Sequence, residues 1–237
     1  EGCRWCDSPG AKSFRPKTFE CETAPGTQEM VEHRNPFSGE GAADLVEKLT
    51  TPDLHSLSFT GGEPTCQLDS LLAVAKALTR RFNPIPLYLE TNGSILPSQD
   101  SLDLLGTYFS YCCVDLKDRS AGATSDSRWK ALVETELAFI DALASRGVEV
   151  FAKLVVTSDT SLEDVRWIGK NLFEITSKEG KPVGLAIQPV TPVETDQEWD
   201  LGVSLSHLNE IFYTAARFLP PEGLTLSIQA HKYLNLL

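Results

Sequence analysis

The sequence has no long uninterrupted apolar run and no region in which lysine and arginine are concentrated. A membrane-spanning helix needs about 20 consecutive apolar residues, and the chain does not open with a charged-then-apolar signal segment. We therefore expect a soluble, cytoplasmic protein without a membrane partner. The 237 residues include 33 acidic and 21 basic side chains, a formal net charge of −12. Because nucleic-acid phosphates are bound by clustered basic side chains, this balance argues against a nucleic-acid partner and favours a small-molecule substrate.

The distribution of the cysteines differs from that of a disulfide framework. The six cysteines form one close pair, one adjacent pair and two isolated residues: Cys3 and Cys6, Cys112 and Cys113, and Cys21 and Cys66. This distribution indicates metal binding or reduced thiols in a reducing compartment. The adjacent pair lies in an apolar run typical of a strand, where free cysteine packs as a small hydrophobic residue. We expect both of its members to be core residues.

The close pair of cysteines stands near the start of the chain, in the stretch Cys3-Arg4-Trp5-Cys6. Two intervening residues turn the chain without separating the sulfurs, so both thiolates can bind one metal centre. Taken alone, the pair fits a zinc site, a redox dithiol or part of an iron–sulfur cluster site. The rest of the sequence has to distinguish these alternatives.

Several segments have the apolar spacing of amphipathic helices. The predicted helices cover residues 39–49, 70–82, 129–146, 161–175 and 204–219. Ser161 is typical of an N-cap, and Asp164 follows it at the spacing of a capping box. Gly147 comes directly after one of these segments, as expected for the end of a helix.

Strand patterns alternate with these helices. The predicted strands cover residues 57–60, 86–90, 111–116, 148–156, 184–190 and 224–229. Successive strands separated by helices form βαβ units, so we expect an α/β fold with a parallel sheet, either a barrel or an open doubly wound sheet. Residues 9–40 are rich in Pro, Gly, Lys and Glu and show only a short strand at 18–22. We interpret them as an insertion or lid within a single domain that spans residues 1–237.

Unusual residues follow the predicted strands. In both architectures, ligands bind at the carboxyl ends of the strands. The segments at those ends are Gly61-Gly62-Glu63-Pro64-Thr65, Thr91-Asn92-Gly93-Ser94, Lys117 and Gln188-Pro189-Val190. Paired glycines leave the backbone accessible to a ligand, and Glu63 supplies an acceptor for an amine or hydroxyl. Tight strand-to-helix turns would also explain the Gly-Gly-Glu-Pro sequence.

The cysteine loop and the Gly-Gly-Glu-Pro segment together resemble the radical S-adenosylmethionine (SAM) enzymes. In that family a Cys-x3-Cys-x2-Cys motif holds a 4Fe–4S cluster, and the fourth iron binds SAM. The resemblance implies a partial (β/α) barrel with parallel strands. It implies that Cys3 and Cys6 are cluster ligands, that Trp5 is the aromatic residue before the last cysteine of the motif, and that the segment Gly61, Gly62, Glu63 and Pro64 receives the methionine amine of SAM.

Two features of that family are absent from the numbered sequence. No cysteine precedes Cys3, and no strand precedes the cysteine loop; the chain opens with Glu1 where an initiator methionine would be expected. We infer that the numbered chain omits upstream sequence that contains the first cysteine and the first strand of the barrel. The alternative is that Cys21 or Cys66 is the third cluster ligand.

Within the radical SAM enzymes, the chain is similar to the 7-carboxy-7-deazaguanine synthases. The matching segments are Cys6-Asp7-Ser8, Thr60-Gly61-Gly62-Glu63-Pro64, Glu90-Thr91-Asn92-Gly93, Gln188-Pro189-Val190 and Gln229-Ala230-His231-Lys232-Tyr233-Leu234. This resemblance implies a lyase of the queuosine and archaeosine pathways. Its substrate would be 6-carboxy-5,6,7,8-tetrahydropterin, which a radical ring contraction converts to 7-carboxy-7-deazaguanine with loss of ammonia.

The same resemblance implies roles for the remaining candidate residues. Those expected to bind SAM are Asn92, Ser94, Asp115, Lys117 and Gln188. Those expected to bind the substrate are Thr65, Gln229, His231 and Leu237. The hydroxyl of Ser8 would contact Mg²⁺. The resemblance also implies a homodimer that receives electrons from a donor such as flavodoxin or ferredoxin.

One segment departs from the synthase pattern. Asp115-Leu116-Lys117 stands where that family has Ser-Pro-Lys, and it is closer to the glycyl-radical activating enzymes. A radical SAM activase is therefore the alternative enzyme. The non-enzyme alternative is a zinc-stabilised SAM-binding module in which Cys3 and Cys6 are structural ligands.

Overall fold

The computed structural model describes residues 3–6, 13, 15–82, 84–180, 182–191 and 202–229. The chain divides into two compact units, each of which is described by itself. Unit 1 contains the described residues of 1–7, 92–96 and 113–237, and unit 2 contains those of 8–91 and 97–112. Within the described part, no helix has the length and apolarity needed to cross a membrane.

The strands that alternate with helices form one six-stranded sheet, in the order β3-β4-β5-β6-β7-β8. The strands are β3 (Leu57–Phe59), β4 (Leu87–Thr91), β5 (Phe109–Leu116), β6 (Glu149–Val156), β7 (Gly184–Pro189) and β8 (Leu224–Leu226). The pairs β3–β4, β6–β7 and β7–β8 are parallel. The predicted α/β fold with a parallel sheet is confirmed. Because the order follows the chain without reversal, the sheet is of the barrel type and not the doubly wound type.

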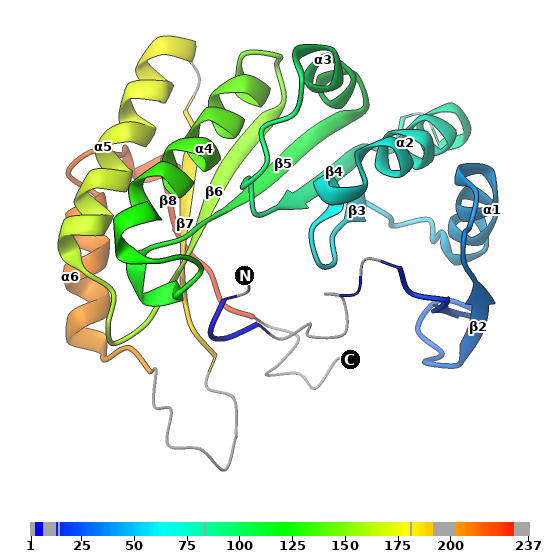
Figure 1. The fold of residues 1–237 in the computed structure, drawn as a ribbon, viewed down its shortest axis with the longest axis horizontal. Coiled ribbons are helices and arrows are strands. Elements are labelled where there is room, and N and C mark those ends of the chain that lie inside the picture. The colour runs from blue at the N-terminus through cyan, green and yellow to red at the C-terminus, as the bar shows by residue number, and fades with distance from the viewer. Residues whose placement is uncertain are drawn as a thin grey trace. The chain divides into compact units, whose positions relative to one another are not determined.

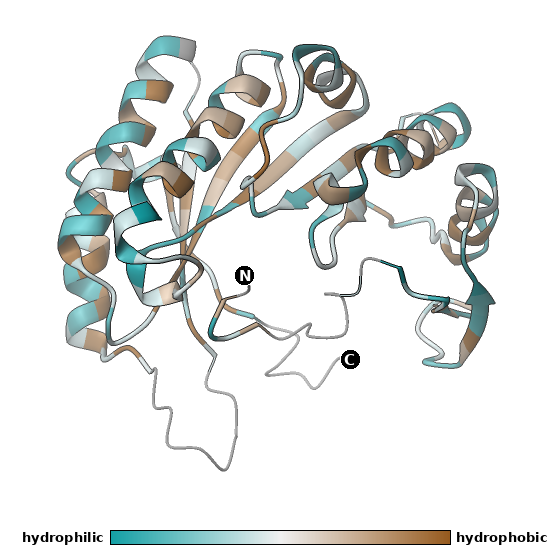
Figure 2. Ribbon diagram, viewed as in Figure 1, coloured by the Kyte–Doolittle hydropathy of each residue, from teal (hydrophilic) through white to brown (hydrophobic). Residues whose placement is uncertain are grey.

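Three helices of unit 1 lie together on one side of the strands β6 to β8 (Figure 1). They are α4 (Asp126–Ala144), α5 (Leu162–Glu179) and α6 (Leu205–Ala215). In β6, buried residues alternate with half-buried ones, as expected for a strand with one face against helices. Figure 2 shows hydrophobic residues along the strands and hydrophilic residues on the outer surfaces of α4 and α5. Lys153 lies on the half-buried face of β6, together with Phe151 and Val155.

Unit 2 contains the helices α1 (Gly39–Leu49), α2 (Leu68–Phe82) and α3 (Gln99–Tyr108). An ideal Cβ built on Gly39 would lie 2.9 Å from the Ala73 carbonyl oxygen, so α1 and α2 approach closely at this glycine. Arg81 of α2 forms ion pairs with Glu40 and Asp44 of α1, at 2.9 and 2.5 Å. The predicted helix at 39–49 is confirmed, whereas α3 was not predicted.

A separate two-stranded sheet precedes α1 in unit 2. β1 (Thr18–Glu22) pairs with β2 (Met30–Arg34) in antiparallel register, with Glu20 opposite Glu32. The rings of Phe19, His33 and Phe37 pack together, with centroids 5.0 to 5.8 Å apart. The predicted strand at 18–22 is confirmed, and β2 was missed. The interpretation of residues 9–40 as an insertion or lid stays a prediction, as does the single domain.

The predicted boundaries differ from the observed ones at several ends. The helix predicted at 70–82 begins at Leu68, directly after the 3₁₀ turn η2 (Pro64–Gln67). The final strand, predicted at 224–229, ends at Leu226. Ser161 is the N-cap of α5 as predicted, and its hydroxyl accepts a hydrogen bond from the Glu163 backbone N–H. The predicted capping box is wrong in its second member, because Asp164 binds Arg119 instead.

Candidate functional site

The loop that carries Cys3 and Cys6 is a tight turn in unit 1. The backbone N–H of Cys6 donates to the Cys3 carbonyl over 3.2 Å. The backbone N–H of Arg4 donates over 3.1 Å to the carbonyl of Ala121, in the 3₁₀ turn η3 (Arg119–Ala121). The Arg4 guanidinium also lies 3.5 Å from Asp159. These contacts hold the loop against the segments that follow β5 and β6.

The thiols of this loop are suitable ligands for a soft metal or an iron–sulfur cluster. Cys3 is half-buried and Cys6 is exposed. Burial raises the pKa of the Cys3 thiol, whereas the nearby Lys117 ammonium lowers it. Across the described residues, no group of three or more His, Cys, Asp or Glu side chains is arranged to hold a metal ion. Cys3 and Cys6 therefore fit two thiolate ligands of a cluster, and the identity of the third ligand stays a prediction.

The predicted residues Asp115 and Lys117 belong to a cluster of charges in unit 1. Asp115 Oδ2 lies 3.4 Å from Lys117 Nζ, and Asp115 Oδ1 lies 2.9 Å from the Nζ of Lys153 in β6. The three side chains are 33%, 11% and 21% exposed, respectively. Asp115 and Lys117 are close enough to Cys3 to influence its pKa. Lys153 was not predicted as a site residue.

The backbone of Lys117 is held on both sides by α4. Its N–H donates to Oε2 of Glu136 over 3.2 Å, and its carbonyl accepts from the indole N–H of Trp129 over 2.7 Å. Glu136 is fully buried, and its Oε1 has no hydrogen-bond partner among the described residues. Burial raises the pKa of Glu136 well above its usual range, and Lys117 opposes this effect. The position of Lys117 is thus determined by helix α4 as well as by the end of β5.

Gly93 places the Asn92–Ser94 segment close to α4. Its φ is +62°, and a Cβ at this position would lie 2.7 Å from Val114 Cγ1 and 3.3 Å from the Cα of Glu136. Such approaches exclude a side chain. The half-buried Asn92 accepts a hydrogen bond from the Ser94 N–H over 2.9 Å, so these two predicted SAM ligands are arranged by a local turn. Unit 1 therefore brings the predicted residues of this segment to the same part of α4 as Lys117.

Two further predicted residues of unit 1, Gln188 and Gln229, lie in β7 and after β8. Gln188 is buried in β7, opposite Val155 of β6. The Gln229 side-chain carbonyl accepts a hydrogen bond from Thr191 over 2.7 Å. Ser8, His231 and Leu237 lie outside the described residues.

Unit 2 contains the Gly61–Thr65 segment between β3 and α2. Oε1 of Glu63 accepts from the Thr65 backbone N–H at 3.0 Å, the Thr65 hydroxyl at 2.5 Å and the Thr91 hydroxyl at 2.6 Å. Gly61 has a φ of +126° and an exposed surface, and Gly62 is exposed as well. The backbone of this segment is accessible to a ligand, and the Glu63 carboxylate is held in one orientation.

Several of these contacts change the interpretation of single residues. Thr65 is buried and donates to Glu63, so its hydroxyl orients a carboxylate in addition to any contact with substrate. Pro64 begins the turn η2, for which Glu63 is the N-cap. Cys21 and Cys66 belong to unit 2, so the alternative that one of them is the third cluster ligand stays a prediction. Both adjacent cysteines are buried, which confirms that Cys112 and Cys113 are core residues.

Sequence reasoning missed three functional candidates in unit 1, namely Lys153, Glu136 and Trp129. The available signal for Lys153 was a charged residue within a strongly β-branched strand, at one of the alternate positions that share a face of that strand. Glu136 occupies the apolar stripe of α4, between Val133 and Ile140 at helical spacing. A charged residue in such a stripe indicates a buried polar contact.

Comparison with known proteins places these features in context. No protein-family model matches the chain. A protein named 7-carboxy-7-deazaguanine synthase from Thermococcus kodakarensis is 36% identical over 236 residues, which cover 99% of this chain and 85% of the relative. A protein of the same name from Methanocaldococcus jannaschii is 30% identical over 236 residues, covering 99% and 87%.

Two solved structures show the same fold at low sequence identity. A domain of the pyruvate-formate lyase-activating enzyme from Bacteroides vulgatus has a TM-score of 0.53 at 14% identity, covering 73% of this chain and 98% of that one. A radical SAM methyltransferase from Sphaerobacter thermophilus has a TM-score of 0.51 at 14% identity, covering 79% and 53%. These likenesses confirm the predicted partial barrel of the radical SAM type.

Proposed function

Because this chain belongs to the family of 7-carboxy-7-deazaguanine synthases, we propose that it converts 6-carboxy-5,6,7,8-tetrahydropterin to 7-carboxy-7-deazaguanine in the queuosine and archaeosine pathways. The observation that carries the proposal is the 36% identity that extends over 99% of the chain. The radical SAM fold and the charge cluster beside the cysteine loop support it. The relatives favour the synthase over the glycyl-radical activase that Asp115-Leu116-Lys117 suggested.

The proposed cofactors are a 4Fe–4S cluster and SAM. When bound, they supply a 5′-deoxyadenosyl radical that removes a hydrogen atom from the substrate. Cys3 and Cys6 hold the cluster through their thiolates, and Trp5 lies between them in the same turn. The oriented Glu63 carboxylate accepts a hydrogen bond from the methionine amine of SAM. The exposed backbone of Gly61 and Gly62 directly precedes Glu63 in the chain.

The other chain residues position the ligands. Asn92, Ser94, Asp115, Lys117 and Gln188 bind SAM. Thr65, Gln229, His231 and Leu237 bind the pterin. The finer parts of the proposal are a Mg²⁺ ion at Ser8, a homodimer, and electron supply by a flavodoxin or ferredoxin. Because a radical reacts with nearby hydrogen donors, the main task of these residues is to hold the target carbon in place and exclude water.

The test is anaerobic reconstitution of the full-length protein with iron and sulfide, followed by iron analysis and incubation with SAM, a reductant and the carboxytetrahydropterin. We expect Cys3→Ser and Cys6→Ser to lose iron, and the buried Cys112→Ala to retain it as a matched control. Formation of 7-carboxy-7-deazaguanine supports the proposal. A cluster that cleaves SAM but leaves this substrate unchanged contradicts the substrate assignment, and zinc without iron favours the zinc-stabilised module.

A further inference from the structure

Arg4, which follows Cys3 in the cysteine loop, connects this loop to the segments that follow two strands of unit 1. Its backbone N–H donates to the Ala121 carbonyl over 3.1 Å, and its guanidinium donates to the Ser120 carbonyl over 3.5 Å. Both carbonyls belong to η3, which follows β5. The guanidinium also lies 3.5 Å from the carboxylate of Asp159, in the segment between β6 and α5. A single residue of the loop therefore contacts the segments after both β5 and β6.

The aliphatic part of Arg4 packs against Gly122, the residue directly after η3. A Cβ built on Gly122 would lie 3.1 Å from both Cγ and Cδ of Arg4, which is below the optimal separation of about 3.5–4.0 Å between carbon atoms. The φ of Gly122 is +61°, a conformation that costs other L-residues about 1–2 kcal/mol. Glycine at this position thus leaves room for the methylene groups of Arg4.

The two segments that Arg4 contacts are joined by a buried hydrogen-bond network. The Ser120 hydroxyl donates to Asp118 over 2.8 Å, and the Thr157 hydroxyl donates to the Ser120 hydroxyl over 3.1 Å. The Asp159 backbone N–H donates to the Thr157 hydroxyl over 3.1 Å. Asp118, Ser120 and Thr157 are at most 7% exposed. Because buried polar networks are rigid when their members are hydrogen-bonded, η3 and the segment of Asp159 are held in a fixed relative position.

The ion pair of Arg4 explains little by itself. The side chains of Arg4 and Asp159 are 34% and 59% exposed, and surface ion pairs of this kind contribute only about 0–1 kcal/mol to stability. Burial has the largest effect on the pKa of the Cys3 thiol, and the charges of Lys117 and Asp115 follow. Since metal ligands are commonly oriented by residues that do not themselves bind the metal, the contacts of Arg4 favour a role in placing the two thiols.

We propose that Arg4 is a positioning residue for the iron–sulfur site, which holds the Cys3 and Cys6 thiolates in the orientation that retains the cluster through its contacts with Gly122 and η3. This inference rests on the proposed function for the presence of a cluster. Residues that orient metal ligands typically contribute about 10- to 100-fold to metal affinity. Because the guanidinium contacts of Arg4 are long, at 3.5 Å, we expect loss of its side chain to raise the rate of iron release by about 10-fold.

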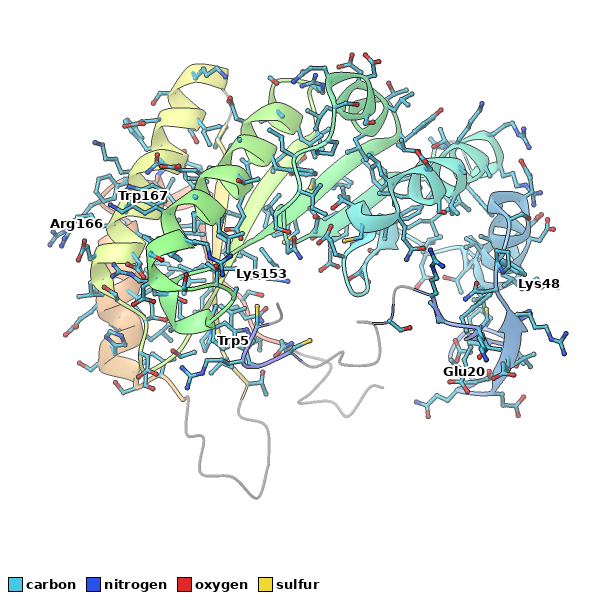
Figure 3. The ribbon with its side chains drawn as sticks, in the orientation of Figure 1. Trp5, Glu20, Lys48, Lys153, Arg166 and Trp167 are labelled. Atoms are coloured by element: carbon cyan, nitrogen blue, oxygen red, sulfur yellow. The ribbon has the colours of Figure 1, made fainter. Side chains whose placement is uncertain are left out.

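The test measures iron release from the anaerobically reconstituted full-length protein to an excess of a chelator. The thermal unfolding midpoint of the same chain is measured by circular dichroism before reconstitution. Arg4→Ala removes the side chain, whereas Arg4→Lys keeps methylene groups and a positive charge. Arg166→Ala is the matched control, because Arg166 is exposed on α5 and points away from Trp5 of the cysteine loop in Figure 3. We expect faster release for Arg4→Ala alone, with the same unfolding midpoint in all three variants.

Gly122→Ala tests the same contact from the other side, and it keeps the inference testable if Arg4→Ala does not fold. Its Cβ should displace the Arg4 side chain and raise the rate of iron release. Gly180→Ala is the control, because Gly180 has a similar φ of +67° and a Cβ there would meet no atom within 4 Å. In the Arg4→Ala background, Gly122→Ala should have little further effect, since the atoms that its Cβ would strike are gone.

Unchanged iron release in Arg4→Ala overturns the inference, as does an additive effect of Arg4→Ala and Gly122→Ala. Faster release that accompanies a lower unfolding midpoint, or that Arg4→Lys does not restore, also overturns it. A wild-type protein that retains iron and shows the expected pattern among the variants, but leaves the carboxytetrahydropterin unchanged, supports this inference and contradicts the substrate of the proposed function.

Discussion

Replacement of Gly93 by alanine tests the close packing of the Asn92–Ser94 segment against Val114 of β5. The left-handed φ of +62° costs an L-residue about 1–2 kcal/mol. The new Cβ would also lie 2.7 Å from Val114 Cγ1, and overpacking of this kind costs about 1–3 kcal/mol. We therefore expect Gly93→Ala to lower the free energy of unfolding by about 2–5 kcal/mol.

Gly147→Ala is the matched control for this substitution. Gly147 also has a positive φ, of +86°, but a Cβ there would meet no atom within 4 Å. Its replacement should cost only the backbone strain of about 1–2 kcal/mol. The entropy that alanine removes from the unfolded chain is the same in both variants, so it cancels in the comparison. The difference between the two variants isolates the steric contribution.

The assay is urea unfolding followed by circular dichroism, with the free energy extrapolated to water. A second variant, Val114→Ala, removes the atom that the new Cβ would strike. In that background the cost of Gly93→Ala should fall toward that of Gly147→Ala. Equal losses for Gly93→Ala and Gly147→Ala, or a cost that Val114→Ala does not reduce, would refute the close approach of Gly93 to Val114 of β5.

Three further substitutions test the contacts around Lys117 and η3. Burial raises the pKa of Glu136 in the folded state above the unfolded value of about 4.3, so the stabilising contribution of this group is lost as pH rises from that value through the folded pKa. Glu136→Gln should therefore flatten the decline of the thermal unfolding midpoint from acid to alkaline pH. An unchanged pH profile would contradict this expectation. Trp129→Phe leaves the Lys117 carbonyl without its indole donor and should cost about 1–3 kcal/mol in urea unfolding; a loss of stability well below that range would contradict it. Arg119→Met removes the bidentate partner of the fully buried Asp164 and should lower the midpoint of thermal unfolding. Adding Asp164→Asn to this variant removes the unpaired buried charge and should restore part of the lost midpoint. A double variant no more stable than Arg119→Met alone would argue against the ion pair of Arg119 and Asp164.

The elements that could be predicted are those with a clear apolar pattern. The strand at 111–116 and the helix at 129–146 bury a continuous row of side chains, and both are present in the structure. β2 escaped prediction because four of its five residues are exposed, so it has no buried face to produce alternation. α3 was missed because it is short, and Gly106 and Thr107 near its end are weak helix formers.

The residues of the candidate site that could be predicted likewise carry a local signal in the sequence. Its loops could be predicted because Gly-Gly-Glu-Pro and Asn92-Gly93 are local signals, and because the resemblance assigned them roles. Lys153 and Glu136 could not be assigned, since their importance depends on which residues of other elements they meet. Asp164 illustrates the same limit. Its spacing from Ser161 favours a local capping box, but its buried carboxylate instead accepts hydrogen bonds from the guanidinium of Arg119, which is distant in sequence.

The indole N–H of Trp129 provides the protein with an intrinsic spectroscopic reporter. The chain contains only four tryptophans, so their indole proton resonances should be resolvable in a nitrogen-labelled sample. The indole N–H of Trp129 donates a hydrogen bond to the Lys117 carbonyl, and the guanidinium of Arg119 lies over the Trp129 ring. Any ligand that moves the backbone at the end of β5 changes the length of this hydrogen bond and hence the chemical shift. Occupancy at Lys117 could thus be followed in solution without attaching a probe near the cysteine loop.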